Sequence, residues 1–328
     1  MPIRSIIIGT GSHVPQRVVT NKDLESRVDT TDEWIRTRTG IIQRHISNNQ
    51  ETNSYLATQS ARKALDMAGV RPQDLDLIIV GTMSPDMPMP SVACLVQNEL
   101  GAKKAGAFDL YAACTSFLYA LSVADKFIRG NSSRMKILVI GSEVLSRVTN
   151  WEDRNTCVLF GDGAGAAVIT GTREDRGILS THLHSDGSLG ELLIIRGLGT
   201  AFPVSHENLE KGWQYIQMQG REVFKHAVKA MESAAWEALE TNGWNGDDVD
   251  LLFSHQANIR IINFLGEKLG LPKEKIFINI HKYGNTSAAS IPIALDEANR
   301  TGLLTPGLRI LMVAFGGGFT WGSVAMCW

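Results

Sequence analysis

Cysteine is scarce in this 328-residue sequence, which has four cysteines and no Cys-x-x-Cys pair. The four are far apart and lie in apolar or small-residue stretches: Cys94, Cys114, Cys157 and Cys327. This spacing excludes a disulfide framework and a zinc-ligand pattern. We therefore interpret all four as reduced thiols of a cytoplasmic protein.

An excess of charge of one sign is also lacking, since 32 basic residues stand against 34 acidic ones. That balance provides no broad positive field, which excludes a general nucleic-acid-binding surface. The apolar run 6–8 near the N-terminus turns at Gly9 and Gly11, so it is too short for a signal peptide or a membrane span. We interpret it as the first strand and predict no membrane association.

What the chain does contain is enough hydrophobic residues, 44%, to bury a large core. Apolar strand-like segments alternate with stretches that have helical periodicity, which indicates an α/β fold with mainly parallel strands. The strands that we predict around the central region are 75–81, 136–141, 250–254, 276–280 and 310–314.

An internal repeat indicates how these elements are organised. Segment 64–77 resembles segment 238–251, 174 positions later, and strand 137–140 resembles strand 310–313, 173 positions later. One nearly constant offset over several elements indicates two copies of one α/β unit packed around a pseudo-twofold axis. We place the two copies at 1–172 and 173–328.

Cys114 is the first candidate for chemistry, because it lies where a predicted strand at 107–110 gives way to a helix. The partial positive charge of a helix N-terminus favours a thiolate, which suits a nucleophile. The alternative interpretation is a buried cysteine that fills a small gap between helix and sheet.

Two polar side chains of the second copy are candidates to act with this thiol. His255 follows the strand at 250–254, and Asn285 precedes the helix that repeats the Cys114 helix. Open α/β sheets carry their chemistry at the carboxyl ends of such strands, so the three side chains can converge. Taken singly, His255 could be a core histidine and Asn285 a helix N-cap.

Two glycine-rich segments complete the pattern. Gly316, Gly317 and Gly318 follow the strand at 310–314 and can bring backbone N–H groups close to a ligand, as an oxyanion hole requires, although a tight turn fits equally well. The run 161–165 lacks the spacing of a phosphate-binding loop, so we interpret it as close packing.

Taken together, five motifs resemble those of β-ketoacyl-acyl carrier protein synthase III, in order and over essentially the whole chain. The matching segments are 113–117, 161–165, 255–258, 284–290 and 315–321. The resemblance implies the thiolase-like fold, with two duplicated α/β halves in a five-layer αβαβα arrangement, and a homodimer. It also implies the condensation that initiates fatty acid biosynthesis.

In that family an acyl-CoA primer acylates the cysteine, and malonyl-acyl carrier protein is then decarboxylated and condensed to 3-oxoacyl-acyl carrier protein. By resemblance, Cys114 is the nucleophile, and His255 and Asn285 donate hydrogen bonds to the malonyl thioester oxygen. The N–H groups of Cys114 and Gly317 would hold the oxyanion. Neither a metal nor a bound cofactor is expected.

The resemblance also implies binding residues. Trp34 and Arg154 match positions that flank the CoA adenine, and Arg38 matches a position on the phosphate side. Further matches are Gly220, Ala257 and Asn258 in the pantetheine tunnel, Lys225, Arg260 and Lys268 in the docking patch for acyl carrier protein, and Met89 in a primer pocket completed by the partner subunit.

The sequence departs from the family pattern beside the nucleophile, where Thr115 and Ser116 replace Ser or Ala and then Gly. Ile42 also stands where many members carry Arg. These departures leave the chain length and branching of the primer open. Three alternatives to a synthase III remain open: a paralogous acyltransferase of secondary metabolism, a Cys-His-Asn hydrolase, and a non-catalytic acyl-binding homologue.

Overall fold

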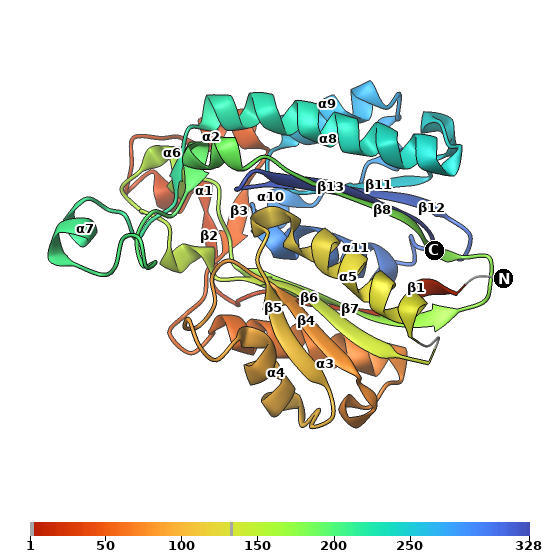
Figure 1. Ribbon diagram of the computed structural model, residues 1–328. Coiled ribbons are helices and arrows are strands. Elements are labelled where there is room, and N and C mark those ends of the chain that lie inside the picture. Colours follow the sequence, from red (N-terminus) through yellow and green to blue (C-terminus); the bar gives the residue numbers. More distant parts are fainter. Residues whose placement is uncertain (1–2, 132–133) are drawn as a thin grey trace.

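The computed structural model describes residues 3–131 and 134–328 and shows five layers, in the order helices, sheet, helices, sheet, helices (Figure 1). The two sheets lie on either side of a central pair of helices. This is the duplicated αβαβα arrangement that the sequence predicts. The boundary between residues 172 and 173 remains a prediction.

The first sheet has the strand order β1-β7-β6-β4-β5. β4 pairs in parallel with both β5 and β6, whereas β7 runs antiparallel to β1 and β6. All strands except β7 therefore point the same way, as the alternating pattern predicts. The strands are β1 (Arg4–His13), β4 (Leu77–Gly81), β5 (Gly106–Leu110), β6 (Lys136–Glu143) and β7 (Gly163–Thr172).

The second sheet repeats this order as β8-β13-β12-β11. β11 pairs in parallel with β12, and β13 runs antiparallel to its two neighbours. The two halves therefore share one topology, which explains the sequence repeat. The strands are β8 (Gly177–Ser185), β11 (Leu251–Ser254), β12 (Arg309–Gly316) and β13 (Thr320–Cys327).

The predicted strand at 276–280 is wrong. Only Ile276 bridges to Leu252, and the chain then enters the short helix α10 (Ile280–Tyr283). The Gln256 side chain explains the change, because its Oε1 accepts the backbone N–H groups of Asn279 and Ile280 at 3.0 and 3.1 Å. These donors are satisfied by a side chain, so no further strand pairing forms.

The helices form three layers that cover both faces of each sheet. α3 and α4 pack on one face of the first sheet, α5 and α11 lie between the sheets, and α8 and α9 cover the second sheet (Figure 1). Their bounds are α3 (Asn53–Ala68), α4 (Val92–Leu100), α5 (Ser116–Gly130), α8 (Gly220–Asn242), α9 (Ile259–Lys268) and α11 (Ser290–Arg300).

The central helices begin in the same unusual way. Single 3-10 turns, Ala113–Thr115 before α5 and Ser287–Ala289 before α11, precede them. Ala113 and Ser287 both have left-handed backbone angles, with φ of 47° and 48°. A non-glycine residue in this region is strained and persists only where the surroundings fix it. The repeat therefore preserves two strained turns, one of which carries Cys114.

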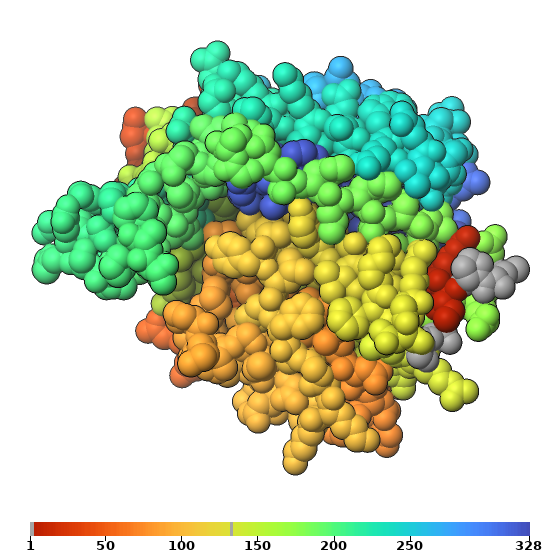
Figure 2. Space-filling model, viewed as in Figure 1, coloured from red at the N-terminus to blue at the C-terminus, as the bar shows by residue number. Residues whose placement is uncertain are grey.

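The shorter elements lie at the edge of this body, near the start of α8. They include an arm around α7 that projects clearly from the surface (Figure 2). Their bounds are β2 (Val18–Thr20), α1 (Asn21–Leu24), α2 (Asp32–Thr39), β3 (Gln43–His45), α6 (Arg154–Cys157), β9 (Leu193–Ile194), α7 (His206–Glu210) and β10 (Gln217–Met218). The other 3-10 turns are Pro72–Asp74, Leu145–Arg147, Gly187–Leu192, Gly246–Asp248 and Lys273–Lys275.

The run 161–165 is a packing segment, as predicted. A Cβ atom on Gly165 would lie 2.6 Å from the backbone nitrogen of Ile293, and one on Gly161 would lie 2.3 Å from the carbonyl oxygen of Tyr283. Both contacts are far shorter than a real Cβ allows, so these glycines let the two halves approach closely.

Candidate active site

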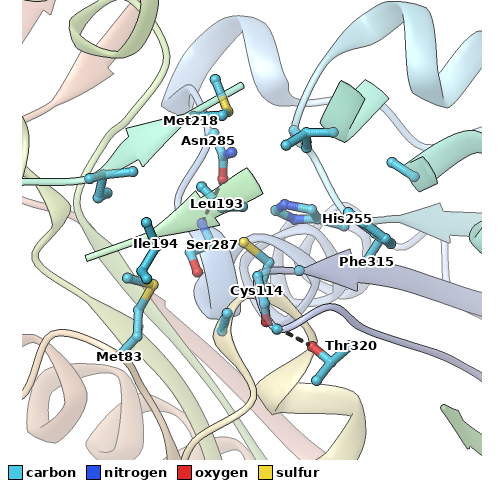
Figure 3. A pocket seen from close by; sticks show the side chains of 18 of the residues that line it. Met83, Cys114, Leu193, Ile194, Met218, His255, Asn285, Ser287, Phe315 and Thr320 are labelled. Atoms are coloured by element: carbon cyan, nitrogen blue, oxygen red, sulfur yellow. Dashed lines mark hydrogen bonds between the residues drawn. The ribbon is translucent and has the colours of Figure 1, made fainter. Parts of the chain in front are cut away.

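The three candidate side chains line one cavity between the halves. It has a volume of about 490 Å³, and its walls are mostly apolar. Cys114, His255 and Asn285 come from different elements and point into the same space (Figure 3). Gly317 lines this cavity as well. The predicted convergence of the amino-terminal thiol with the carboxy-terminal imidazole and carboxamide is therefore present in the fold.

Cys114 lies in the 3-10 turn between β5 and α5 and is partly exposed to the cavity. Burial raises the pKa of its thiol to about 12; hydrogen bonding with Ser287 opposes this rise, and the charge of Glu143 adds to it. The prediction that the helix end lowers this pKa is therefore wrong. Desolvation and a nearby carboxylate outweigh the helix N-terminus.

His255 follows β11, and its backbone N–H bonds to the carbonyl of Val313 at 2.8 Å. Burial lowers the pKa of its imidazole to about 4, so the ring is neutral near pH 7. Nδ1 lies 2.7 Å from the hydroxyl of Ser290. When that hydroxyl donates, the ring proton is on Nε2, and the imidazole can donate a hydrogen bond.

Asn285 is held by its own backbone. Its N–H donates to the carbonyl of Leu159 at 2.9 Å, and its carbonyl accepts from Gly161 at 3.0 Å. The side-chain Oδ1 accepts the backbone N–H of Ser287 at 2.8 Å. Because the oxygen is occupied, the Nδ2 amide group is the one left to donate to a ligand. His255 and Asn285 are thus both neutral donors.

The glycine run after β12 approaches the nucleophile closely. A Cβ on Gly316 would lie 2.7 Å from the backbone nitrogen of Cys114, so only glycine fits there. Gly317 and Gly318 follow and also line the cavity. The glycine loop therefore packs against the backbone of the turn that carries Cys114, and Gly317 shares the cavity with the thiol, which is compatible with an oxyanion site.

The residues expected to bind CoA fall into two groups. Gly220, Ala257 and Asn258 line the cavity. The second group consists of Trp34, Arg38 and Arg154, which lie outside the lining. In that group the guanidinium carbons of Arg154 and Arg38 lie 4.3 and 5.8 Å from the ring centre of Trp34.

A hydrogen bond joins the two groups. The Asn258 amide donates to the carbonyl of Arg38 at 3.0 Å, which places the cationic aromatic cluster next to the cavity wall. A flat aromatic ring with an arginine over it suits a purine ring.

The predicted docking residues are exposed on α8 and α9. Lys225 pairs with Glu222 at 2.7 Å, the guanidinium carbon of Arg260 lies 5.4 Å from the ring of Phe224, and Lys268 lies 5.4 Å from the ring of Phe264. Phe224 itself lines the cavity, so Arg260 lies near it. Met89 is 84% exposed and does not contribute to the cavity of this chain.

The departures beside the nucleophile do not narrow the cavity. The Thr115 hydroxyl donates to the carbonyl of Thr320 at 3.1 Å, and the Ser116 hydroxyl accepts from the N–H of Ala112 at 2.8 Å. Both side chains are buried and lie outside the lining. The bulk of these two side chains therefore does not enter the cavity. Ile42 is also outside the lining.

Sequence reasoning missed three polar residues around the site: Glu143, Ser287 and Ser290. Glu143 ends β6 and is completely buried, and it accepts a hydrogen bond from Ser287 at 3.0 Å. Ser287 lies within a motif that the sequence analysis singled out, but no local pattern connects it to a residue 144 positions away. Only the packing of the halves reveals the contact.

Comparison with known proteins agrees with this site. The family model described as 3-oxoacyl-[acyl-carrier-protein (ACP)] synthase III matches residues 108–187, and the model of its C-terminal part matches residues 239–328. A curated β-ketoacyl-[acyl-carrier-protein] synthase III from Desulfotalea psychrophila is 53% identical over 326 residues, covering 98% of this chain and 99% of that protein. The chain belongs to this family.

Solved structures of a synthase III and of a priming β-ketosynthase have the same fold. The 3-oxoacyl-[acyl-carrier-protein] synthase III of Aquifex aeolicus is 52% identical, with a TM-score of 0.92, and covers 99% of this chain and 100% of that one. The priming β-ketosynthase of the R1128 polyketide pathway is 36% identical, with a TM-score of 0.91, and covers 100% of this chain and 98% of that one.

Across residues 3–131 and 134–328, no helix is long and apolar enough to cross a membrane. In the same residues, no group of three or more His, Cys, Asp or Glu side chains could hold a metal ion.

Proposed function

We propose that this protein is a decarboxylating acyltransferase that makes 3-oxoacyl-acyl carrier protein from an acyl-CoA primer and malonyl-acyl carrier protein. Cys114 takes the acyl group as a thioester, which divides one difficult exchange into two easier steps. The reaction starts fatty acid biosynthesis and uses only its substrates, without a metal or cofactor.

One observation carries the proposal: a nucleophilic side chain and two neutral donors share one apolar cavity. Loss of CO₂ from the malonyl group forms an enolate, whose oxygen needs hydrogen bonds rather than a base. His255 and Asn285 suit this role, because the imidazole is neutral and the carboxamide has its Nδ2 free to donate. Each donor contributes about 3 kcal/mol to such a transition state.

The acyl-transfer step uses a second set of donors. The oxyanion of the tetrahedral intermediate would be held by the N–H groups of Cys114 and Gly317, on the side where the glycine loop approaches the thiol. This separates the two half-reactions in space. One oxyanion site serves acyl transfer, and the other serves decarboxylation.

Substrate binding is proposed from the same geometry. The CoA adenine would stack at Trp34 and Arg154, with Arg38 on the phosphate side. The pantetheine arm would pass Gly220, Ala257 and Asn258 to reach the thiol. The acidic carrier protein would dock on the exposed basic residues Lys225, Arg260 and Lys268.

We also propose a cytoplasmic homodimer in which the partner subunit's Met89 reaches the primer pocket. β5 is an edge strand of its sheet, and an edge strand can pair with a second chain. Met89 lies in the loop after β4, and Tyr111, which is 71% exposed, follows the adjacent strand β5. These exposed apolar side chains at the ends of neighbouring strands support an interface there.

The hydrolase alternative does not fit the hydrogen bonds of the site. In a Cys-His-Asn hydrolase, the asparagine orients the imidazole through its ring N–H. Here Nδ1 of His255 faces Ser290, and Oδ1 of Asn285 faces the backbone of Ser287. A paralogous synthase that accepts another primer shares all of this chemistry, so a panel of acyl-CoA primers would define the primer class.

The test separates the two half-reactions. We expect His255→Ala and Asn285→Ala to keep self-acylation from acyl-CoA while each loses about 100-fold or more in malonyl decarboxylation. Acyl-enzyme is measured by intact mass, and decarboxylation by CO₂ release. Equal loss of both activities would favour the hydrolase scheme and contradict the proposal.

A further inference from the structure

A completely buried arginine lies beside the loop that carries Asn285, and the proposed chemistry gives it no role. Arg44 is the central residue of β3, and burial lowers the pKa of its guanidinium to about 10, so the group stays charged near pH 7. Its N–H groups donate to neutral oxygens of Val19, Asn21 and Val158. Burying a cation among neutral acceptors is costly, which points to a role other than stability.

The guanidinium of Arg44 joins two separate parts of the chain. Nη2 donates to the carbonyl of Val158 at 2.7 Å, and Nη1 donates to Oδ1 of Asn21 at 2.9 Å. Asn21 is itself held in place, because its amide donates to the carbonyl of Ile41 at 2.7 Å and to the carboxylate of Asp32 at 2.9 Å. Arg44 therefore ties the chain at Val158 to a side chain that two further bonds fix.

Val158 begins the segment that holds the backbone of Asn285. The carbonyl of the next residue, Leu159, accepts the N–H of Asn285 at 2.9 Å, and the carbonyl of Asn285 accepts the N–H of Gly161 at 3.0 Å. Between these two bonds, Phe160 forms a parallel bridge with Asn285. Asn285 therefore takes its position from segment 158–161, which Arg44 holds at its first residue.

The stem of Arg44 packs between the same two parts of the chain. A Cβ atom on Gly161 would lie 3.1 Å from the Cβ of Arg44, and one on Gly284 would lie 3.3 Å from it. β3 also lies against α10, which leads directly into Gly284 and Asn285 (Figure 1). Arg44 thus contacts both the segment that holds Asn285 and the residue that precedes it.

The direction of the Asn285 amide depends on this support. Segment 158–161 fixes the backbone, and the side-chain Oδ1 accepts the N–H of Ser287 at 2.8 Å, so together they set where Nδ2 points. A hydrogen-bond donor must lie within about 0.5 Å of its productive position to serve a transition state. A displacement of about 1 Å costs on the order of 100-fold in rate.

From this geometry we propose that Arg44 is a positioning residue for decarboxylation, because it fixes the segment that aims the Asn285 carboxamide at the malonyl thioester oxygen. The inference rests on the proposed role of Asn285. Arg44 is completely buried and lies outside the cavity lining, so it acts through Asn285 and does not touch the substrate.

The test compares the two half-reactions in the full-length protein. Arg44→Met removes the guanidinium and keeps a long apolar stem. We expect malonyl decarboxylation, measured as CO₂ release, to fall by about tenfold in kcat with little change in KM, because the donor is displaced in the transition state. Self-acylation by acyl-CoA, measured by intact mass, should stay within about twofold of the wild-type rate, because Cys114 lies on another element.

A double-mutant cycle tests whether Arg44 acts through Asn285. In the Asn285→Ala background, Arg44→Met should lower decarboxylation further by less than about twofold, because no donor is left to displace. The same loss in both backgrounds would mean that Arg44 acts elsewhere and would overturn the proposal.

Arg129→Met is the matched control. Arg129 lies on α5, and its Nη2 donates to the carbonyl of Ile178 at 2.7 Å, the same length as the bond from Arg44 to Val158. It also lies outside the cavity lining. We expect this variant to lose stability in urea titrations while decarboxylation is unchanged. If decarboxylation falls as far as in Arg44→Met, lost stability explains both results and the positioning role is wrong.

Arg44→Lys separates position from charge. Lysine keeps the positive charge, but its single nitrogen replaces a planar group that reaches Val158 and Asn21 through different nitrogens. We expect decarboxylation to fall by about fivefold, the effect of one lost hydrogen bond. A wild-type rate would show that charge alone is sufficient and would contradict the positioning role, and this variant decides if Arg44→Met does not fold. Decarboxylation that persists in Asn285→Ala would instead refute the proposed role of Asn285, so the two failures are distinguishable.

Discussion

Replacing Ser290 with alanine tests how the decarboxylation site is set up. The Ser290 hydroxyl lies 2.7 Å from Nδ1 of His255. When this hydroxyl donates, the ring proton is on Nε2, which is the donor proposed for the malonyl thioester oxygen. A neutral hydrogen bond of this kind contributes about 1 kcal/mol, or roughly a fivefold effect on an equilibrium. Removal of the whole donor, as in His255→Ala, costs about 3 kcal/mol, or more than 100-fold.

We therefore expect Ser290→Ala to lower malonyl decarboxylation by about fivefold, well short of the loss in His255→Ala. Acylation of Cys114 should be unchanged, because the Ser290 hydroxyl contacts His255, which the proposal places in decarboxylation and not in acylation. The assay is CO₂ release from malonyl thioester, with intact mass for acylation, and Ser290→Thr should restore the rate by returning a hydroxyl. An equal fall in both half-reactions, or no fall in decarboxylation, would refute the assignment.

The neutral imidazole of His255 also determines how decarboxylation should depend on pH. Burial lowers the pKa of His255 to about 4, so the neutral donor persists as the pH falls below 6.5. The rate should therefore show no inflection near pH 6.5. An acid limb with a midpoint there would mean that the imidazole titrates like an exposed histidine.

Three other predictions follow from the structure. Trp34→Ala should raise the KM for acyl-CoA by about tenfold with kcat little changed. The substitution removes the aromatic ring whose centre lies 4.3 Å from the guanidinium carbon of Arg154, where the adenine is proposed to stack. An unchanged KM would place the adenine elsewhere. Arg260→Glu should raise the KM for the carrier protein more than that for acyl-CoA, since the large acidic carrier protein is proposed to cover the surface of α9 that carries Arg260, whereas the CoA phosphates are proposed to lie near Arg38. Equal effects would argue against this docking surface. Gly165→Ala should lower the free energy of unfolding by about 3 kcal/mol in urea titrations. The control is Gly130→Ala, which should not lower this free energy because the added Cβ would meet nothing within 4 Å. Similar stability in both variants would contradict the close-packing interpretation.

The fold and the convergence of Cys114, His255 and Asn285 on one cavity could be predicted, because their signals are local or repeated. Hydrophobic periodicity marks the Cys114 helix, and the repeat offset places the thiol opposite Asn285. The same offset holds in the structure: the strained residues Ala113 and Ser287 are 174 positions apart. The prediction of a strand at 276–280 is wrong, because the Gln256 side chain accepts the backbone N–H groups of Asn279 and Ile280, which strand pairing would need.

The surroundings of these three side chains could not be predicted in the same way. Glu143 meets Ser287 only when the end of one central strand packs against a turn from the other half. The direction of the thiol pKa likewise depends on burial and on that carboxylate, neither of which a helix N-terminus reveals in sequence. Long-range contacts of this kind have no periodic pattern and come only from the packed halves.

The most direct measurement of the central claim is peptide mapping by mass spectrometry after brief incubation with an acyl-CoA. Cys114 is the thiol that shares a cavity with His255 and Asn285, so the acyl mass should appear on the peptide that carries it and be absent from Cys114→Ser. An acyl group on Cys94, Cys157 or Cys327, or on Cys114→Ser itself, would contradict the account.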